Sequence, residues 1–262
     1  MAASEDQSLR WRQLLRLLDV EGFVTVASLC RRLHTSEPTV RRDLVALERQ
    51  GLLRRVRGGA VAHGPGESPF VRRVREHAAE KQAIAARAAA EIGPGQCVAL
   101  DIGTTMVYLA QILADRGAIS GTRFVTNGLR TARALARSGT PVVVTGGVLR
   151  PGEDSLVGPV ARRAVRGYAF DAFFLSASAV TPRGVLDVNM DEIEVKQEFL
   201  LRSAATYALV DSRKMAADGP GVRACDLRAL TGVVTDPGIT AASRRFLQEA
   251  GVRVLVGTMP AR

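Results

Sequence analysis

Apolar residues in the first fifty positions recur at helical spacing. Three groups share this pattern: Leu14, Leu15, Leu17 and Leu18; Val26, Leu29 and Leu33; and Val40, Leu44 and Leu47. Because a helix turns 100° per residue, each group lies along one face of a helix. The pattern therefore predicts three short helices that pack their apolar faces together.

Hydroxyl residues mark the starts of the second and third helices. Thr25 and Ser36 stand just before them, and a hydroxyl at that place accepts a hydrogen bond from an unpaired backbone N–H group. Only a short turn around His34 and Thr35 separates the two helices. Two short helices so joined predict a helix-turn-helix, with residues 25–33 as the supporting helix and 37–50 as the recognition helix.

The segment after the third helix has the pattern of a hairpin. LLRRV and AVA are two short strand-like runs on either side of Arg57, Gly58 and Gly59. Glycine permits the positive φ that a tight hairpin turn requires. A hairpin beside a recognition helix is a wing, so we expect a winged helix-turn-helix domain over residues 1–62.

Helical geometry divides the arginines of this region. Val40, Leu44 and Leu47 share the packed face, Arg42 and Arg49 lie opposite, and Arg41 flanks them. Base contacts come chiefly from the first turns of a recognition helix, and wing cations reach phosphates or the minor groove. Any single arginine could serve solubility alone, but the whole set favours DNA. The predicted DNA-binding residues are Ser36, Glu37, Pro38, Thr39, Arg41, Arg42, Arg49, Arg54, Arg55 and Arg57.

From residue 97 onward, short apolar runs alternate with helical stretches. The runs are CVAL at 97, RFVT at 123, PVVVT at 141, DAFFL at 171, TYALV at 206, TGVVT at 231 and VRVLV at 252. Continuous apolar strands separated by helices are typical of a parallel sheet with helices on both faces. The fold class predicted for the chain is α/β, with a larger, open, mainly parallel domain over residues 77–262.

A segment rich in proline and glycine separates the two regions. HGPGESPF, at 63–70, predicts a linker that extends over residues 63–76. The alanine-rich amphipathic stretch from Pro69 to Ile92 predicts one helix that enters the second domain and covers its sheet. A solvated connector helix is the alternative.

Composition narrows the function. The net charge of +10 favours a polyanionic partner. The three cysteines are isolated and only three histidines occur, so we expect no metal site, no disulfide framework and no catalytic histidine. No apolar run is long enough to span a membrane and no secretory signal is present, so we expect a cytoplasmic protein.

Turns suited to an anion follow the predicted strands. In DIGTT, Asp101, Gly103, Thr104 and Thr105 stand between a strand and a helix, where free N–H groups and the helix dipole favour an anion. A simple capped helix would explain the same residues. Related turns follow later strands, at residues 126–128, 145–147 and 211–214, and the carboxyl ends of parallel strands share one rim. GxGxxG and Walker lysine motifs are absent, which argues against a dinucleotide or nucleoside triphosphate.

Both regions resemble one family. VTVASLCRRLHTSEPTVRRDLVALERQGLLRRVRGGAV resembles the N-terminal domain of DeoR-type bacterial transcriptional regulators, with TVRRDL and GGA as its specific parts. DIGTT, VTNG, TGG, SLVG, DAFFLSASAV, GVLDVNMDEIEVKQEFL and DSRK resemble the effector domain of that family. The resemblance implies a fold similar to ribose 5-phosphate isomerase and a phosphorylated sugar as effector.

The resemblance also implies the residues of the effector site. They are Asp101, Gly103, Thr104, Thr105, Asn127, Gly146, Gly147, Arg150 and Lys214. Arg150 has an alternative, which is to pair with Glu153 or Asp154.

We therefore expect a transcriptional regulator, most simply a repressor of carbohydrate metabolism genes, with operator DNA and a sugar phosphate as partners and no cofactor. Two-fold operators call for two winged helices, so we also expect a homo-oligomer associated with the nucleoid. The competing hypothesis is an isomerase-like enzyme that carries a nucleic-acid-binding module. Asp101, Asp187 or Glu192, together with Lys214, would then supply the acid–base chemistry.

Overall fold

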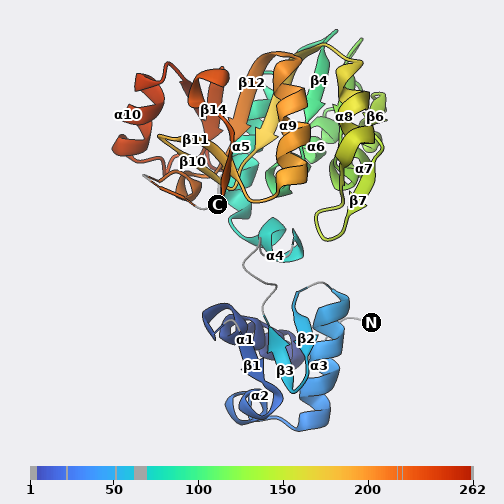
Figure 1. Cartoon of the computed structure of the whole chain (residues 1–262), viewed down its shortest axis with the longest axis vertical. Helices are drawn as coiled ribbons and strands as arrows, with labels where there is room; N and C mark the ends of the chain where they lie inside the picture. The colour runs from blue at the N-terminus through green and yellow to red at the C-terminus, as the bar shows by residue number, and fades with distance from the viewer. Residues whose placement is uncertain are drawn as a thin grey trace. The chain divides into compact units, whose positions relative to one another are not determined.

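The computed structural model describes residues 5–21, 23–50, 52–61, 70–216, 218–219 and 221–260. The chain divides into two compact units, Met1–Glu76 and His77–Arg262, which are called the first and the second unit below (Figure 1). Of the predicted linker, residues 63–69 lie outside the described residues.

Helices and a small antiparallel sheet form the first unit. In chain order its elements are α1 (Glu5–Glu21), β1 (Phe23–Thr25), α2 (Val26–Arg32), α3 (Glu37–Arg49), β2 (Arg54–Val56), β3 (Gly59–Val61) and α4 (Phe70–Arg75). The three predicted helices and the hairpin of β2 and β3 are present, and Leu29, Val40 and Leu47 are fully buried between them. Strand β1 was not predicted; it pairs with β3, with Val24 opposite Ala60.

The two predicted helix caps differ. Thr25 accepts a hydrogen bond from the Ser28 N–H group at 3.1 Å, as expected. Ser36 occupies the cap position of α3 but makes no side-chain cap bond, and its hydroxyl lies 3.0 Å from that of Thr39. The prediction for Ser36 was wrong because Pro38 lacks one of the two N–H groups that such a hydroxyl would accept from.

Glycine is needed at each of the two positions in the wing for a different reason. Gly58 forms the turn, with φ of +84°. Gly59 lies in β3, where a Cβ atom would come within 2.3 Å of the carbonyl oxygen of Val24. Strand β1 therefore approaches the wing too closely for any side chain at residue 59.

A seven-stranded sheet forms the centre of the second unit, and every two neighbouring strands in it pair in parallel. Its spatial order is β15-β14-β12-β9-β4-β5-β6. The strands are β4 (Cys97–Leu100), β5 (Arg123–Thr126), β6 (Val142–Val144), β9 (Phe170–Ser176), β12 (Ser203–Leu209), β14 (Gly232–Thr235) and β15 (Arg253–Val256). Each of the seven predicted runs forms one strand, which confirms the predicted fold class.

Helices cover both faces of this sheet (Figure 1). One core lies under α5 (Ala78–Ala89), α6 (Thr104–Asp115) and α7 (Leu129–Leu135). The other lies under α8 (Gly158–Arg166), α9 (Met190–Leu201) and α10 (Ala241–Glu249). Short 3-10 helices complete the unit: η1 (Ala136–Ser138), η2 (Ser212–Lys214) and η3 (Leu227–Ala229).

The single helix expected from Pro69 to Ile92 is two helices. Helix α4 ends at Arg75 and α5 begins at Ala78, because His77 between them adopts a left-handed conformation with φ of +53°. Only α5 covers the sheet, through buried residues such as Ile84 and Ala88.

Two smaller sheets were not predicted. The first is a hairpin of β7 (Val148–Arg150) and β8 (Ser155–Val157). The second is an antiparallel sheet of three strands, β10 (Ala179–Thr181), β11 (Gly184–Asp187) and β13 (Val222–Cys225). In the chain, β7 and β8 follow β6, β10 and β11 follow β9, and β13 follows β12.

The order of the strands reverses beside β4. The chain runs outward from β4 through β5 to β6 and then returns to β9 on the other side of β4. Ligands of open α/β sheets bind outside the carboxyl ends of the strands at such a switch point. A ligand of this unit is therefore expected beside the residues that follow β4 and β9.

Candidate functional site

The outer face of α3 carries half of the predicted DNA-binding residues. Glu37, Pro38, Arg41, Arg42 and Arg49 are exposed there. A shallow hollow on this face is lined by Arg41, Arg42, Val45, Ala46 and Arg49. Cationic rims around an apolar floor fit the edges of base pairs, since arginine binds guanine and small apolar groups contact the thymine methyl.

Two of the six predicted arginines form ion pairs with glutamates of α3. Arg41 binds Glu37 one turn before it, with Nε 2.8 Å from Oε1. Arg55 donates to Glu48 from both its backbone N–H group, at 2.8 Å, and its Nε atom, at 2.6 Å. The remaining four have no ion-pair partner among the described residues and are exposed: Arg42, Arg49, Arg54 and Arg57.

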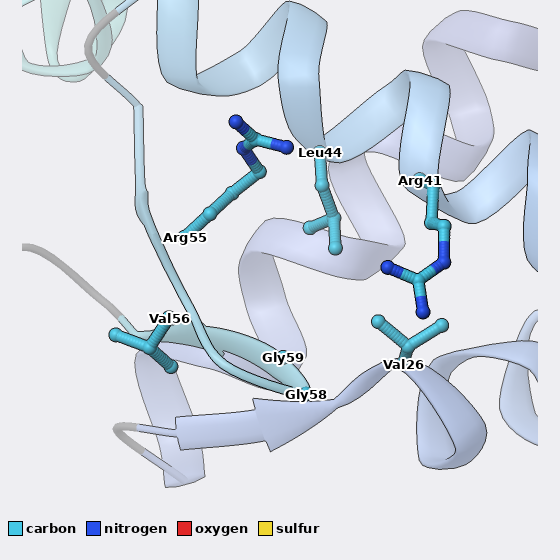
Figure 2. Close-up of a pocket in the computed structure, with 7 residues that line it drawn as sticks. All are labelled: Val26, Arg41, Leu44, Arg55, Val56, Gly58 and Gly59. Carbon is cyan, nitrogen blue, oxygen red and sulfur yellow. The ribbon is translucent and has the colours of Figure 1, made fainter.

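The bonds between Glu48 and Arg55 join α3 to the wing. They hold the pKa of Glu48 below its ordinary value, chiefly through the side-chain hydrogen bond from Arg55. Figure 2 shows Leu44 between the side chains of Arg41 and Arg55. The wing and α3 enclose a small cavity of about 50 Å³ there, lined by Val26, Arg41, Leu44, Arg55, Val56, Gly58 and Gly59. Arg55 therefore positions the wing as well as adding charge.

A buried acid on α3 escaped the sequence reasoning. Asp43 is 2% exposed and accepts bonds from Arg10, at 2.5 and 3.2 Å, and from Trp11 Nε1, at 2.7 Å. The hydrogen bond to Asp43 raises the pKa of Arg10. These bonds attach α1 to the packed side of the recognition helix.

At the switch point of the second unit, Asp101 follows β4 and is 1% exposed. Its Oδ2 atom accepts from the Ser176 N–H group at 2.9 Å and from the Ser176 hydroxyl at 3.1 Å, and it binds the Lys196 ammonium. Lys196 comes from α9 and also lies 3.2 Å from Asp187 Oδ2. The structure thus brings four residues together in one cluster, from the end of β4, from β9, from β11 and from α9, and the three charged ones are buried.

Mutual attraction favours the charged forms of Lys196 and Asp187. Burial opposes the charge of Lys196, but Asp101, Asp187 and Glu192 outweigh burial and raise the pKa of Lys196. Burial likewise opposes the charge of Asp187, but Lys196 and the hydrogen bonds to Asp187 lower its pKa. Among those bonds, the Ser178 hydroxyl and the Val188 N–H group each donate to Asp187 at 2.8 Å.

Arg150 pairs with a partner that the sequence did not indicate. Its Nη1 atom lies 2.8 Å from Oε1 of Glu192, and the Ser155 hydroxyl donates to the same oxygen at 2.5 Å. Neither Glu153 nor Asp154 is its partner, and Asp154 binds Arg130 at 3.0 Å. The hairpin of β7 and β8 is therefore attached to α9.

The other predicted effector residues follow the carboxyl ends of parallel strands. Gly103 has φ of +102° and leads into α6, whose first residues are Thr104 and Thr105. No side chain caps α6 and its first turn has no acid, so its N–H groups suit an anion. Asn127 follows β5, and Gly146 and Gly147 follow β6 with φ of +70° and +120°.

Lys214 follows β12 and reaches the loop after β9. Its Nζ atom donates to the carbonyl oxygen of Ala177 at 2.8 Å. Sequence reasoning missed Ser176 and Lys196 and considered Asp187 and Glu192 only as groups of an enzyme. One signal was present: lysine is rare here, at three of 36 basic residues, and Lys196 is one of the three.

The described residues contain no group of three or more His, Cys, Asp or Glu side chains that could hold a metal ion. Within the same part of the chain, no helix has the length and apolar character needed to cross a membrane.

Solved structures resemble this chain only in part. Ribose 5-phosphate isomerase A from Neisseria gonorrhoeae is 15% identical, with a TM-score of 0.39 over 52% of this chain and 53% of that one.

Curated relatives match along nearly the whole chain. The HTH-type transcriptional regulator GlpR of Haloferax volcanii is 34% identical over 95% of this chain and 97% of its own length. The putative aga operon transcriptional repressor of Escherichia coli O157:H7 is 31% identical over 95% and 93%. The lactose phosphotransferase system repressor of Staphylococcus aureus is 29% identical over 87% and 91%.

Family models account for both units. The DeoR-like helix-turn-helix domain matches residues 10–64, and the DeoR C terminal sensor domain matches residues 76–237. Together with the winged helix-turn-helix and the parallel sheet described above, these matches show that the chain belongs to the DeoR family of transcriptional regulators.

Proposed function

We propose that the protein represses genes of sugar metabolism and leaves its operator when a phosphorylated sugar binds the second unit. The observation that carries the proposal is the outer face of α3, where Arg42 and Arg49 are exposed without ion-pair partners. Repressors among the relatives, one of them named for a lactose phosphotransferase system, support the same function.

The arginines have different roles in this proposal. Arg42 lies in the early part of α3, where side chains reach base edges. Arg49, Arg54 and Arg57 bind phosphates, and Arg55 holds the wing through Glu48. Phosphate contacts fix the position of the protein on DNA, whereas base contacts select the sequence.

The effector phosphate binds the start of α6 in this proposal. Free N–H groups and the helix dipole favour an anion at Gly103, Thr104 and Thr105, and Lys214 adds a positive charge from the loop after β12. Binding changes the arrangement of two DNA-binding units in a homo-oligomer. A coupling free energy of about 1 to 3 kcal/mol would change operator affinity about 5- to 150-fold. The protein would act on chromosomal DNA in the cytoplasm.

The isomerase hypothesis is less well supported. Its candidate bases are engaged, because Asp101 and Asp187 bind Lys196 and Glu192 binds Arg150. The lowered pKa of Asp187 makes that carboxylate a weaker base, whereas a general base works best with a pKa near the working pH. Curated relatives are named as transcriptional regulators.

The DNA proposal predicts that Arg42→Ala lowers affinity for the operator by about 1 to 3 kcal/mol while affinity for unrelated DNA falls much less. Arg57→Ala should weaken binding to both DNAs by a similar factor. Because one phosphate contact is lost, the slope of the logarithm of the binding constant against the logarithm of salt concentration should become less steep by about one. Operator fragments selected from a random library would be titrated by fluorescence anisotropy at several salt concentrations.

A matched control separates binding from net charge. Arg163→Ala removes an exposed arginine from α8 in the second unit, and it should bind operator as the wild type does. If Arg42→Ala binds operator and unrelated DNA as tightly as Arg163→Ala does, Arg42 makes no base contact.

The effector proposal predicts that Lys214→Ala loses the response to sugar phosphates while operator affinity is unchanged. Lys214 supplies the positive charge, and its neighbour Arg213, which pairs with Asp211 at 3.0 Å, supplies the control. Operator release would be measured with fructose 6-phosphate, glucose 6-phosphate and ribose 5-phosphate. A Lys214→Ala protein that responds as well as Arg213→Ala would remove Lys214 from the site.

A further inference from the structure

The hollow on the outer face of α3 has an apolar floor to which the proposed function assigns no role. Val45 and Ala46 form this floor and are half-buried, and Arg41, Arg42 and Arg49 surround it. The hollow has a volume of about 340 Å³, and nearly all of its exposed surface is apolar. Neither floor residue belongs to the core that the described residues of the first unit form on the opposite side of the helix.

The hollow follows one stripe of the helix. The side chains of this stripe are separated by three, one and three residues: Arg42, Val45, Ala46 and Arg49. At 100° per residue they share one face. The recognition helices of homeodomains read the major groove from side chains with the same spacing. The floor of the hollow therefore faces the bases when α3 lies in a major groove.

The rim of the hollow is positively charged. Arg42 and Arg49 are exposed and have no ion-pair partner among the described residues. None of the described residues that line the hollow is acidic, and Glu37 and Glu48 of the same helix are each bound to another arginine. DNA has phosphates along both sides of its groove, so its charge complements this rim. An apolar protein segment would have to supply acidic groups of its own.

One group on the floor of the major groove is apolar, the C5-methyl group of thymine. The short side chains of Val45 and Ala46 let that floor approach α3 closely, while the longer arginines extend past it. Guanine, adenine and cytosine present hydrogen-bonding groups at the same edge, and an apolar floor leaves such groups without a partner. The chemistry of the hollow therefore favours thymine.

From this geometry we infer that Val45 and Ala46 bind the methyl group of one thymine in each operator half-site and select the sequence together with Arg42. Residue 42 is separated from residues 45 and 46 by about 4.5 to 6 Å along the helix axis, and one base-pair step is about 3.4 Å. The thymine therefore lies one or two base pairs from the base that Arg42 contacts. The inference rests on the proposed function, since it requires α3 in the major groove of an operator.

The test uses operator fragments selected from a random library, in which each thymine is replaced in turn by deoxyuridine, which lacks only the methyl group. Affinity for the full chain is measured by fluorescence anisotropy at one salt concentration. One replacement in each half-site should weaken binding about fourfold, which is the contribution of one buried methyl group. At the same position, 5-methylcytosine should bind more tightly than cytosine by a similar factor.

Two variants assign the methyl group to the hollow. Val45→Thr keeps the size of the side chain but places a hydroxyl in the floor, so the effect of deoxyuridine should fall below twofold. Ala46→Val fills the hollow, so the fragment with deoxyuridine should bind at least as tightly as the fragment with thymine. Val56→Thr is the matched control, because Val56 is a half-buried valine of the wing that does not line this hollow, and it should keep the fourfold effect.

The comparison of thymine with deoxyuridine in the wild-type protein needs no variant, so poor folding of a variant leaves the inference testable. An effect below 1.5-fold at every thymine overturns the inference and leaves the proposed function standing. An effect that stays unchanged in folded Val45→Thr and Ala46→Val proteins also overturns it, and this is the result expected if the hollow binds a protein segment instead. A library that yields no preferred sequence contradicts both the proposed function and the inference. A methyl effect without operator release by sugar phosphates supports the inference and contradicts the effector part of the proposed function.

Discussion

Replacing Lys196 by methionine should destabilise the second unit by about 3 to 5 kcal/mol, because removal of the cation leaves the buried carboxylates without a charged partner. The side chains of Lys196 and Asp101 are each 1% exposed, and that of Asp187 is 6% exposed. Methionine fills a similar volume but leaves both carboxylates without a cation. For a unit of this size, the expected fall in melting temperature is about 6 to 20 °C.

The measurement is thermal and urea unfolding of the full chain, followed by circular dichroism. Arg163→Met is the control, since Arg163 is exposed on α8 and the same exchange there should change stability by less than about 0.5 kcal/mol. Equal melting temperatures for Lys196→Met and Arg163→Met would show that the cluster contributes nothing to stability.

The effect of Lys196→Met should depend on pH in a defined direction. The pKa of Asp187 is lowered, so its contribution is present above the unfolded pKa of about 3.9 and is lost as the pH falls through the folded pKa. The pKa of Lys196 is raised, so its contribution is fully present below about pH 10.4 and is lost as the pH rises through the folded pKa. The difference in stability between the variant and the wild type should therefore be largest between about pH 4 and 10 and should shrink in acid.

Sequence pattern was sufficient for the main sheet because its strands are short continuous apolar runs, and those inside the sheet, such as β4 and β14, are almost entirely buried. CVAL and TGVVT have no polar interruption, and this is typical of a covered parallel strand. The small sheets have no such signal. Strands β7 and β8 have three residues each and owe their position to Arg150 and Ser155, which bind Glu192 far along the chain. The break at His77 is also a local conformation that an alanine-rich amphipathic pattern does not reveal.

The candidate sites show the same division. Exposed arginines on α3 follow from helical periodicity, because Val40, Leu44 and Leu47 define the buried face. Lys196 does not follow, since a lysine between glutamates in EIEVKQEF has the pattern of an exposed helix position. It is buried because three strands and α9 bring Asp101 and Asp187 to it. Asp101 is 95 residues away from Lys196 in the sequence.

Asp43→Ala should destabilise the first unit by about 2 to 4 kcal/mol, since hydrogen bonds to charged groups contribute about 1.5 to 3 kcal/mol each and Arg10 is only partly buried. The change leaves Arg10 and Trp11 without the acceptor that attaches α1 to α3. Affinity for operator should fall as well, because Asp43 neighbours Arg42 on the same helix.

Two variants of α3 separate this role from a general effect of charge. Asp43→Asn keeps an acceptor for Trp11 but loses the charge opposite Arg10, so its stability should fall between those of the wild type and Asp43→Ala. Glu37→Ala removes an exposed acid whose pair with Arg41 has the spacing of one helical turn, and such pairs contribute about 0.3 to 0.5 kcal/mol. Unfolding of the full chain would be followed by Trp11 fluorescence, which reports on the first unit because Trp11 is the single tryptophan. If Asp43→Ala unfolds at the same urea concentration as Glu37→Ala, the buried acid does not hold α1 against the recognition helix, and any loss of operator affinity must come from another cause.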